Sequence, residues 1–338
     1  MTLLSWLGGV GTAAVFLWSA AAEKPGALDE VEQVMPGRRG QATRISRPDA
    51  DPLPVRDIAE GRNFTWTPEQ ASRPLRFRAG QVTLTIRNTV SEVSDDLVQP
   101  RITVEAPGRR SQVIRGTDSW PIGEHMIGIG ELDRSGKRFV YYQGFSGGAH
   151  CCRVQIVAVV TDRAIEIVEL GSWDGAPVDE FPRDVNGDGT VDFVERDDRF
   201  RYAFGGGGAS YGPPQILNIS PAYDWTRAVD VSLDPSFRHL YAAQMREAGR
   251  QCLTDQGGSG ENADCAVYVA AAARIGRLDE AWRNMLRSYN RQDDYEFPTG
   301  CRFILTEHQD CPANAAIRFT NFPEALRHFL RENGYIAL

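Results

Sequence analysis

Three chemical signatures are missing from this 338-residue sequence. Basic residues do not outnumber acidic ones: 37 Lys and Arg stand against 45 Asp and Glu, and the formal net charge is -8. The glycine tract at 205–208 is not followed by the Gly-Lys-Ser/Thr of a phosphate-binding loop, and no His-Glu-x-x-His zinc motif occurs. These absences argue against nucleic-acid binding, a phosphate-loop nucleotide site and a zinc protease of that type, whereas an acidic chain suits a divalent cation.

Charge is also absent from the first 22 residues, which contain no Asp, Glu, Lys or Arg. The run ends in three alanines at 20–22, the small-residue pattern of a secretory cleavage site, so we expect a signal peptide at 1–22. The alternative is an uncleaved N-terminal anchor, because the run is almost long enough to span a bilayer and Trp6 and Trp18 are placed like interfacial anchors. Either way we expect a periplasmic or secreted protein, with a membrane tether if the segment is retained.

Six cysteines fit an exported chain, in which an even number usually indicates disulfides. Cys252 with Cys265, and Cys301 with Cys311, are two local pairs that would each close a short polar loop. The remaining two, Cys151-Cys152, are adjacent. A disulfide between neighbours is strained, so these two could also stay reduced or pair elsewhere. The sequence leaves the connectivity open.

Composition divides the rest of the chain into three parts. Residues 23–60 are rich in Pro, Arg, Gly and Asp and have no sustained apolar period, which predicts a disordered tether. Residues 61–230 carry short alternating apolar runs broken by Gly, Pro and Asp, which predict an antiparallel β domain. Residues 235–338 have apolar residues at helical spacing, which predict a small helical domain with the local disulfides. The expected fold class is therefore α+β and β-rich.

The helical part contains one recognisable hairpin. The stretch CAVYVAAAARIGRLDEAWRNMLRSY predicts two helices joined at Gly276, which would cap the first helix, while Asp279 begins the second. RIGRLDEAW resembles the turn between paired helices of tetratricopeptide-type repeats. A solenoid needs about three such repeats to bury its faces, and one is visible. We expect a helical cap on the β domain, with a peptide-binding helical hairpin as the alternative.

The most specific pattern is RDVNGDGTVDFVERDD, in which oxygen-bearing side chains recur at alternate positions. Counted from Asp184 as position one, it matches the D-x-[DN]-x-[DN]-G calcium loop with its distal Glu. Calcium takes roughly six to eight hard oxygens, alternate side chains of a curled loop converge on one point, and Gly189 supplies the positive φ that the curl needs. Magnesium fits less well, because it keeps its waters. The predicted ligands are Asp184, Asn186, Asp188, Thr190 through its carbonyl, Asp192 and Glu195.

The flanks distinguish this loop from an EF-hand. Gly175, Pro177 and Pro182 precede it, which no regular helix tolerates, and the residues after it continue as a β-rich run. We therefore expect a strand–loop–strand site, in which the outgoing strand can aim Glu195 elsewhere. Such a loop resembles the calcium loops of FG-GAP or VCBS-type repeats, which occur in integrin-like β-propellers and many secreted bacterial proteins.

A weaker copy of the loop lies upstream in ELDRSGKRFVYY. Glu131, Asp133, Ser135 and Gly136 align with positions one, three, five and six, but the distal acids are missing. Two copies a blade-length apart predict propeller-blade-like repeats, although a closed propeller takes about four blades or more. The SGGAHCC segment and the DxNGDG loop together resemble a family of exported bacterial proteins of unknown function, which implies a fold relationship and no activity.

One segment gathers reactive groups. GFSGGAHCC holds Ser146, His150, Cys151 and Cys152, which could form a thiolate–imidazole pair or a soft-metal site. Residues 144–148 also spell the G-x-S-x-G string of nucleophile elbows, a motif that requires a strand entering and a helix leaving. A strand-like run follows instead. We therefore predict a structural turn and assign no catalytic residue, with a hydrolase or thiol-redox enzyme as the alternative.

Together these patterns predict an exported calcium-binding protein rather than an enzyme. Its expected role is that of a binding or envelope-associated protein in which Ca²⁺ stabilises a strand–loop–strand site. The expected partner is a protein, peptide or glycan, and not nucleic acid.

Overall fold

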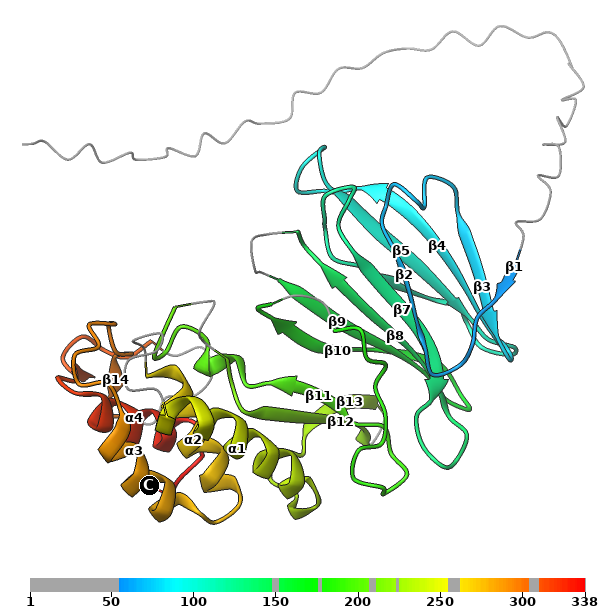
Figure 1. The fold of residues 1–338 in the computed structure, drawn as a ribbon. Helices are drawn as coiled ribbons and strands as arrows, with labels where there is room; N and C mark the ends of the chain where they lie inside the picture. The colour runs from blue at the N-terminus through cyan, green and yellow to red at the C-terminus, as the bar shows by residue number, and fades with distance from the viewer. Residues whose placement is uncertain are drawn as a thin grey trace, which may run out of the picture. The chain divides into compact units, whose positions relative to one another are not determined.

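The chain is mostly β-structure, in a computed structural model that describes residues 55–147, 152–175, 178–206, 211–222, 225–254, 262–303 and 310–337. Several antiparallel sheets are followed by a few helices (Figure 1), which confirms the β-rich α+β class. The predicted signal peptide and the tether before residue 55 lie outside the described residues. The last part of the predicted tether already contributes a strand, β1, at Val55–Asp57.

Two five-stranded sheets pack face to face as a sandwich. The first has the order β1-β3-β4-β5-β6, and only its β1–β3 pair is parallel. The second, the middle sheet, has the order β10-β9-β8-β7-β2 and is antiparallel throughout. Alternate residues such as Leu84 and Ile86 share one buried core with Ile127 and Val140 of the middle sheet, as the period of two predicts. The bounds are β2 Asn63–Trp66, β3 Leu75–Ala79, β4 Val82–Val90, β5 Val98–Glu105, β6 Gln112–Arg115, β7 His125–Glu131, β8 Arg138–Phe145, β9 Arg153–Val160 and β10 Ile165–Trp173.

The middle sheet is covered on its other face as well. There Phe139 and Tyr141 of β8 share a core with residues of a three-stranded sheet, β11 (Phe193–Arg196), β12 (Pro214–Ala222) and β13 (Trp225–Asp230). Strands buried on both faces have near-continuous apolar sequences, which explains why β8 and β9 do not alternate cleanly. The described strands therefore form stacked layers and do not close into a propeller.

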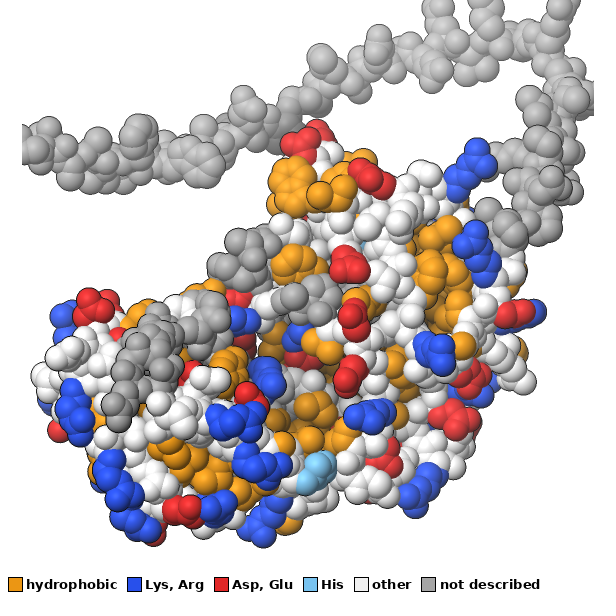
Figure 2. All heavy atoms as spheres, in the orientation of Figure 1, with side chains coloured by type: hydrophobic (Ala, Val, Ile, Leu, Met, Phe, Trp, Pro, Cys, Tyr) orange, Lys and Arg blue, Asp and Glu red, His pale blue; other side chains and the backbone are white. Residues whose placement is uncertain are grey.

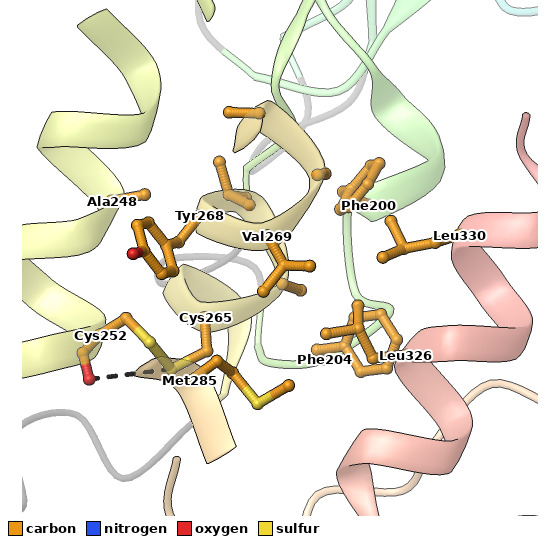
Figure 3. Packing of buried hydrophobic residues seen from close by; sticks show 14 of the residues in the cluster. Phe200, Phe204, Ala248, Cys252, Cys265, Tyr268, Val269, Met285, Leu326 and Leu330 are labelled. Carbon is orange, nitrogen blue, oxygen red and sulfur yellow. Dashed lines mark hydrogen bonds between the residues drawn. A yellow bond between two sulfur atoms is a disulfide. The ribbon is translucent and has the colours of Figure 1, made fainter. Parts of the chain in front are cut away.

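In the part of the chain after β13 that the structure describes, four helices surround a separate core. They are α1 (Arg238–Thr254), α2 (Ala263–Arg274), α3 (Leu278–Ser288) and α4 (Phe322–Glu332), with short 3₁₀ turns η1 (Asp198–Phe200) and η2 (Pro235–Phe237) and the ribbon β14 (Gly300–Cys301) and β15 (Ala316–Ile317). α2 is buried along almost its whole length. Phe200 and Phe204 project from the segment before β12 into this core, where they lie beside Leu326 and Leu330 of α4 (Figure 3). The helical core thus includes side chains from the β part of the chain.

Several local predictions in the helical part are confirmed. The disulfides Cys252–Cys265 and Cys301–Cys311 are both formed. Gly276 has a φ of 78° directly after α2, and the Arg277 N–H donates to the Ala272 carbonyl, which is how a left-handed glycine caps a helix. Asp279 lies in the first turn of α3.

The surface mixes charges of both signs. On the face shown in Figure 2, Lys and Arg side chains lie among Asp and Glu side chains over both the strands and the helices. Within the described ranges, no helix combines the length and apolar character needed to cross a bilayer.

Gly128 tests the packing of the middle sheet. A Cβ at this position would lie 2.5 Å from Phe181 Cε2 and 2.6 Å from the Arg62 carbonyl oxygen. We expect Gly128→Ala to lower the free energy of unfolding by about 1–3 kcal/mol, because neither neighbour can move away freely. Urea denaturation measures this, with Gly136→Asn as the control, since Gly136 has open space around it and Asn tolerates its positive φ. Equal effects of the two substitutions would contradict this packing.

Candidate functional site

The predicted calcium loop, residues 184–192, is closed at its base by two backbone contacts. The Asp192 N–H donates to the Arg183 carbonyl at 3.0 Å, and the Val191 N–H donates to the Leu132 carbonyl at 2.9 Å. Residues 178–183, which enter the loop, are not helical, and β11 leaves it. The loop therefore has the non-EF-hand context that its flanks predicted, but the expected entering strand is wrong, because residues 178–183 form only the isolated bridge of Arg183 with Asp192.

Asp184 holds the curl of the loop. Its Oδ1 accepts the Gly187 N–H at 2.6 Å and its Oδ2 accepts the Gly189 N–H at 2.8 Å. Both glycines have positive φ, 83° and 93°, as the curl requires. Burial acts to raise the pKa of Asp184, but the backbone hydrogen bonds outweigh it and the pKa lies below its ordinary value. The carboxylate at position one is therefore charged and fixed.

Asn186 and Asp188 repeat the same local bonding. Asn186 Oδ1 accepts the Asp188 N–H at 3.0 Å, and Asp188 Oδ1 accepts the Thr190 N–H at 2.7 Å. Asn186 Nδ2 also donates to Asp188 Oδ2 at 3.1 Å, so the two side chains face each other. A carboxylate has about four lone-pair sites, so each oxygen that accepts one hydrogen bond can still contact a cation.

Asp192 anchors the loop to the protein interior. It is 1% exposed, and its carboxylate accepts the Val185 N–H at 2.8 Å and the Asn218 amide at 2.7 Å. Burial raises the pKa of Asp192, and the nearby carboxylates of Asp188 and Asp184 raise it further. The carboxylates at positions one and five are therefore close enough to act on the one at position nine.

Glu195, the predicted ligand at position twelve, lies in a different network. It is buried in β11, where its carboxylate pairs with Arg153 of β9 and accepts the Gln155 amide. Burial raises the pKa of Glu195. The structure thus gathers Asp184, Asn186, Asp188, Thr190 and Asp192 in one loop and turns Glu195 toward the middle sheet. Within the described ranges, no group of three or more His, Cys, Asp and Glu side chains could hold a metal ion by itself.

The weaker upstream copy lies directly against this loop. Asp133 and Thr190 form an antiparallel bridge, and Arg134 Nη2 donates to the Gly187 carbonyl at 3.1 Å. Asp133 repeats the local bonding of Asn186, with which it aligns, since its Oδ1 accepts the Ser135 N–H at 2.9 Å as Asn186 Oδ1 accepts the Asp188 N–H. Its other oxygen pairs with Lys137 at 3.1 Å, so a protein cation already balances this carboxylate.

Ser146 and Cys152 lie between two strands and are hydrogen-bonded to each other. The Ser146 N–H donates to the Cys152 carbonyl at 3.0 Å, and the Cys152 N–H donates to Ser146 Oγ at 2.7 Å. β8 precedes Ser146 and β9 follows Cys152, so the strand-to-helix context of a nucleophile elbow is not formed. Cys152 is in a disulfide, and the described part of the chain contains no free cysteine. His150 and Cys151 lie outside the described residues.

The fold assembles elsewhere a Ser–His pair that no sequence motif indicated. Ser119 Oγ lies 2.8 Å from His125 Nε2, and Tyr142 Oη lies 2.9 Å from His125 Nδ1. Tyr142 Oη also accepts the Thr117 N–H at 3.0 Å. Ser119, His125 and Tyr142 are each 0% exposed, so no substrate reaches them and the network is structural.

The buried imidazole of His125 should make the folded protein less stable at acid pH. Burial lowers the pKa of His125 from 6.5 to about 4, so between these values the unfolded chain takes up a proton that the folded chain does not. We expect this group to cost roughly 3 kcal/mol of stability as the pH falls across that window, and to add nothing further below it. Urea denaturation at several pH values measures the slope. His125→Gln should flatten the slope relative to the parent chain, and His239→Gln, at an exposed site, should not. Identical slopes in the parent and His125→Gln would contradict the assignment.

Substitutions of Arg153 and Glu195 should have non-additive effects on the free energy of unfolding. Arg153→Met leaves the Glu195 charge buried without its cation, so we expect a loss of about 3–5 kcal/mol. Arg153→Met with Glu195→Leu removes both charges and should cost less than either single change. A double-mutant cycle in urea measures the coupling, and strictly additive losses would show that the two charges do not interact.

Comparison with known proteins places the chain in a family. Residues 239–334 match the family described as the sll0997 C-terminal domain. The "Probable thylakoid lumen protein sll0997" of Synechocystis sp. is 32% identical over 242 residues, which are 70% of this chain and 68% of that protein. The "Uncharacterized protein y4bJ" of Sinorhizobium fredii is 27% identical over 279 residues, which are 80% of this chain and 42% of y4bJ. No solved structure matches significantly. The coverage and identity of the Synechocystis protein show that the chain belongs to the sll0997 family.

Proposed function

We propose that the protein is an exported, non-enzymatic binding or envelope-associated protein in which Ca²⁺ stabilises the loop at 184–192. The observation that carries this is the repulsion that the Asp184 and Asp188 carboxylates exert on the buried Asp192, in a loop already curled by its own hydrogen bonds. A hard dication relieves such repulsion, and carboxylate, amide and backbone oxygens are the donors that calcium takes. Asp184, Asn186, Asp188, Asp192 and the Thr190 carbonyl would hold the ion. Glu195 is not included, because Arg153 and Gln155 hold it.

Export is supported by two observations. The related Synechocystis protein is named for the thylakoid lumen, a compartment reached by export. The two disulfides Cys252–Cys265 and Cys301–Cys311 are typical of proteins that fold outside the reducing cytoplasm. A periplasmic or secreted location accommodates both.

A non-enzymatic role is supported by the state of the reactive groups. Cys152 is in a disulfide, and Ser146 lies between two strands. The buried Ser119–His125 pair has no access for a substrate. The peptide-binding alternative for the helical hairpin finds less support, because α2 is enclosed along its length by the helical core.

The FG-GAP/VCBS resemblance and the blade-like repeat remain part of the proposal. Asp133 and Asp184 both bind the N–H groups that follow them in the chain, and Asp133 pairs directly with Thr190. These contacts support a relationship between the two loops, of which only the second would take an ion.

Calcium should raise the stability of the purified protein. At a free concentration about a hundred times the Kd, a ligand that binds only the folded state adds about 2.7 kcal/mol. We therefore expect a higher Tm in Ca²⁺ than in EDTA, measured by calorimetry, together with a single binding event in titration calorimetry. Asp188→Asn should abolish both effects. Asp133→Asn, in the neighbouring turn, should leave them unchanged, and a parent Tm that is the same in Ca²⁺ and in EDTA would disprove the proposal.

A further inference from the structure

One end of the sandwich exposes four large apolar side chains, which we call the apolar end. Val90, Val93, Trp120 and Ile122 are 64%, 77%, 50% and 72% exposed. Val90 ends β4 and begins the loop at 90–97 that leads to β5, which also holds Val93; Trp120 and Ile122 lie in the connection at 116–124 between β6 and β7. The loops lie side by side, because the Val98 N–H donates to the Ser119 carbonyl at 2.8 Å and the Ser119 N–H donates to the Val98 carbonyl at 3.0 Å.

Contacts with neighbouring segments hold the loops of the apolar end in place. Ser119 is bonded to the buried His125, and the Pro121 carbonyl accepts the Glu69 N–H at 3.1 Å. Gly147 lies against Trp120, so that a Cβ there would be 3.0 Å from Cδ1 of the indole. A surface whose loops are fixed in advance loses little conformational entropy on binding.

The two loops carry charge of one sign. They contain five acidic residues, Glu92, Asp95, Asp96, Asp118 and Glu124, and no Lys or Arg. Glu92 is 88% exposed and reaches Arg101 of β5 only at 3.9 Å. Figure 2 shows apolar side chains flanked by acidic ones at this end of the β domain. Contiguous exposed apolar surface with a polar rim marks a docking site more often than an idle surface.

A hollow adjoins the apolar end. It has a volume of about 370 Å³ and shares Val98 and Pro121 with the two loops. Pro68, Ala71 and Pro74 line it together with one acid, Glu69, and one base, Arg87. A hollow of this size and lining accepts an apolar anchor side chain, which is the usual centre of a protein interface.

We propose that the apolar end docks a protein segment that combines apolar anchors with flanking Lys or Arg residues. The apolar residues and the hollow would take the anchors, and the acidic loops would attract the bases and repel acidic competitors. The same acids disfavour an anionic bilayer. The apolar end and the calcium loop lie near opposite ends of β7. His125, which begins β7, is bonded to Ser119 of the apolar end, whereas Asp133, which follows β7, pairs with Thr190 of the calcium loop. The proposal therefore does not depend on calcium binding.

Fluorescence anisotropy with the full chain tests the proposal. The probe is a labelled synthetic peptide that combines Leu and Arg, compared with its counterpart in which Glu replaces Arg. We expect the Leu/Arg peptide to bind at least about tenfold more tightly, and the difference to shrink as salt is added. Equal affinity for the two peptides would overturn the proposal.

Variants locate the binding on the molecule. Trp120→Ala with Ile122→Ser should weaken the Leu/Arg peptide about tenfold or more, since both side chains are exposed and their loss leaves the core intact. Leu233→Ser removes an apolar side chain that is 74% exposed elsewhere and should change nothing. The proposal fails if the double variant binds like the parent, or if the protein binds phosphatidylglycerol vesicles in preference to the peptide.

Discussion

The structure depends on a middle sheet that is buried on both faces. A polar group on such a sheet has no water to bond, and leaving it unpaired costs about 1–3 kcal/mol. On the sandwich side, His125 meets this requirement through Ser119 and Tyr142. On the other side, Gln155 donates to both Gln143 and Glu195, next to the Arg153–Glu195 pair. These polar residues therefore fix one another's positions in the layers that the middle sheet joins.

The same requirement explains why the candidate calcium loop lacks its twelfth ligand. Side chains alternate along β11, so Phe193 and Glu195 both face the middle sheet, where Phe193 packs in the core and Glu195 meets Arg153. Drawing Glu195 back to an ion would leave the Arg153 charge buried alone, which costs more than one ligand supplies. The loop relies instead on Asp192, whose carboxylate is oriented by Asn218 of β12. The strand that follows the loop thus decides which acids remain available to it.

Local patterns in the sequence predicted the β-rich class, the two disulfides, the glycine cap at Gly276 and the non-helical entry to the loop. All of these depend on residues close together in the chain. The sequence did not reveal the Arg153–Glu195 pair or the insertion of Phe200 and Phe204 into the helical core. Both depend on which strands and helices become neighbours, and residue spacing alone carries no information about that. For the same reason, the flanks of the loop could cast doubt on Glu195 as a ligand, but they could not identify Arg153 as its partner.

The loop also connects the sheets to the helices. Val185, at position two, packs against the cluster of Ile216, Phe237 and Tyr241, and its N–H donates to Asp192. Asn186 Nδ2 donates to Ser236 Oγ at 3.0 Å, in the 3₁₀ turn that leads directly into α1. Val185 and Asn186 therefore both link the loop to the segment before α1, and Asn186 also donates to Asp188 Oδ2 within the loop. Because Asn186 bonds both to Asp188 in the loop and to Ser236 just before α1, a change that loosens the acidic centre also loosens the start of α1.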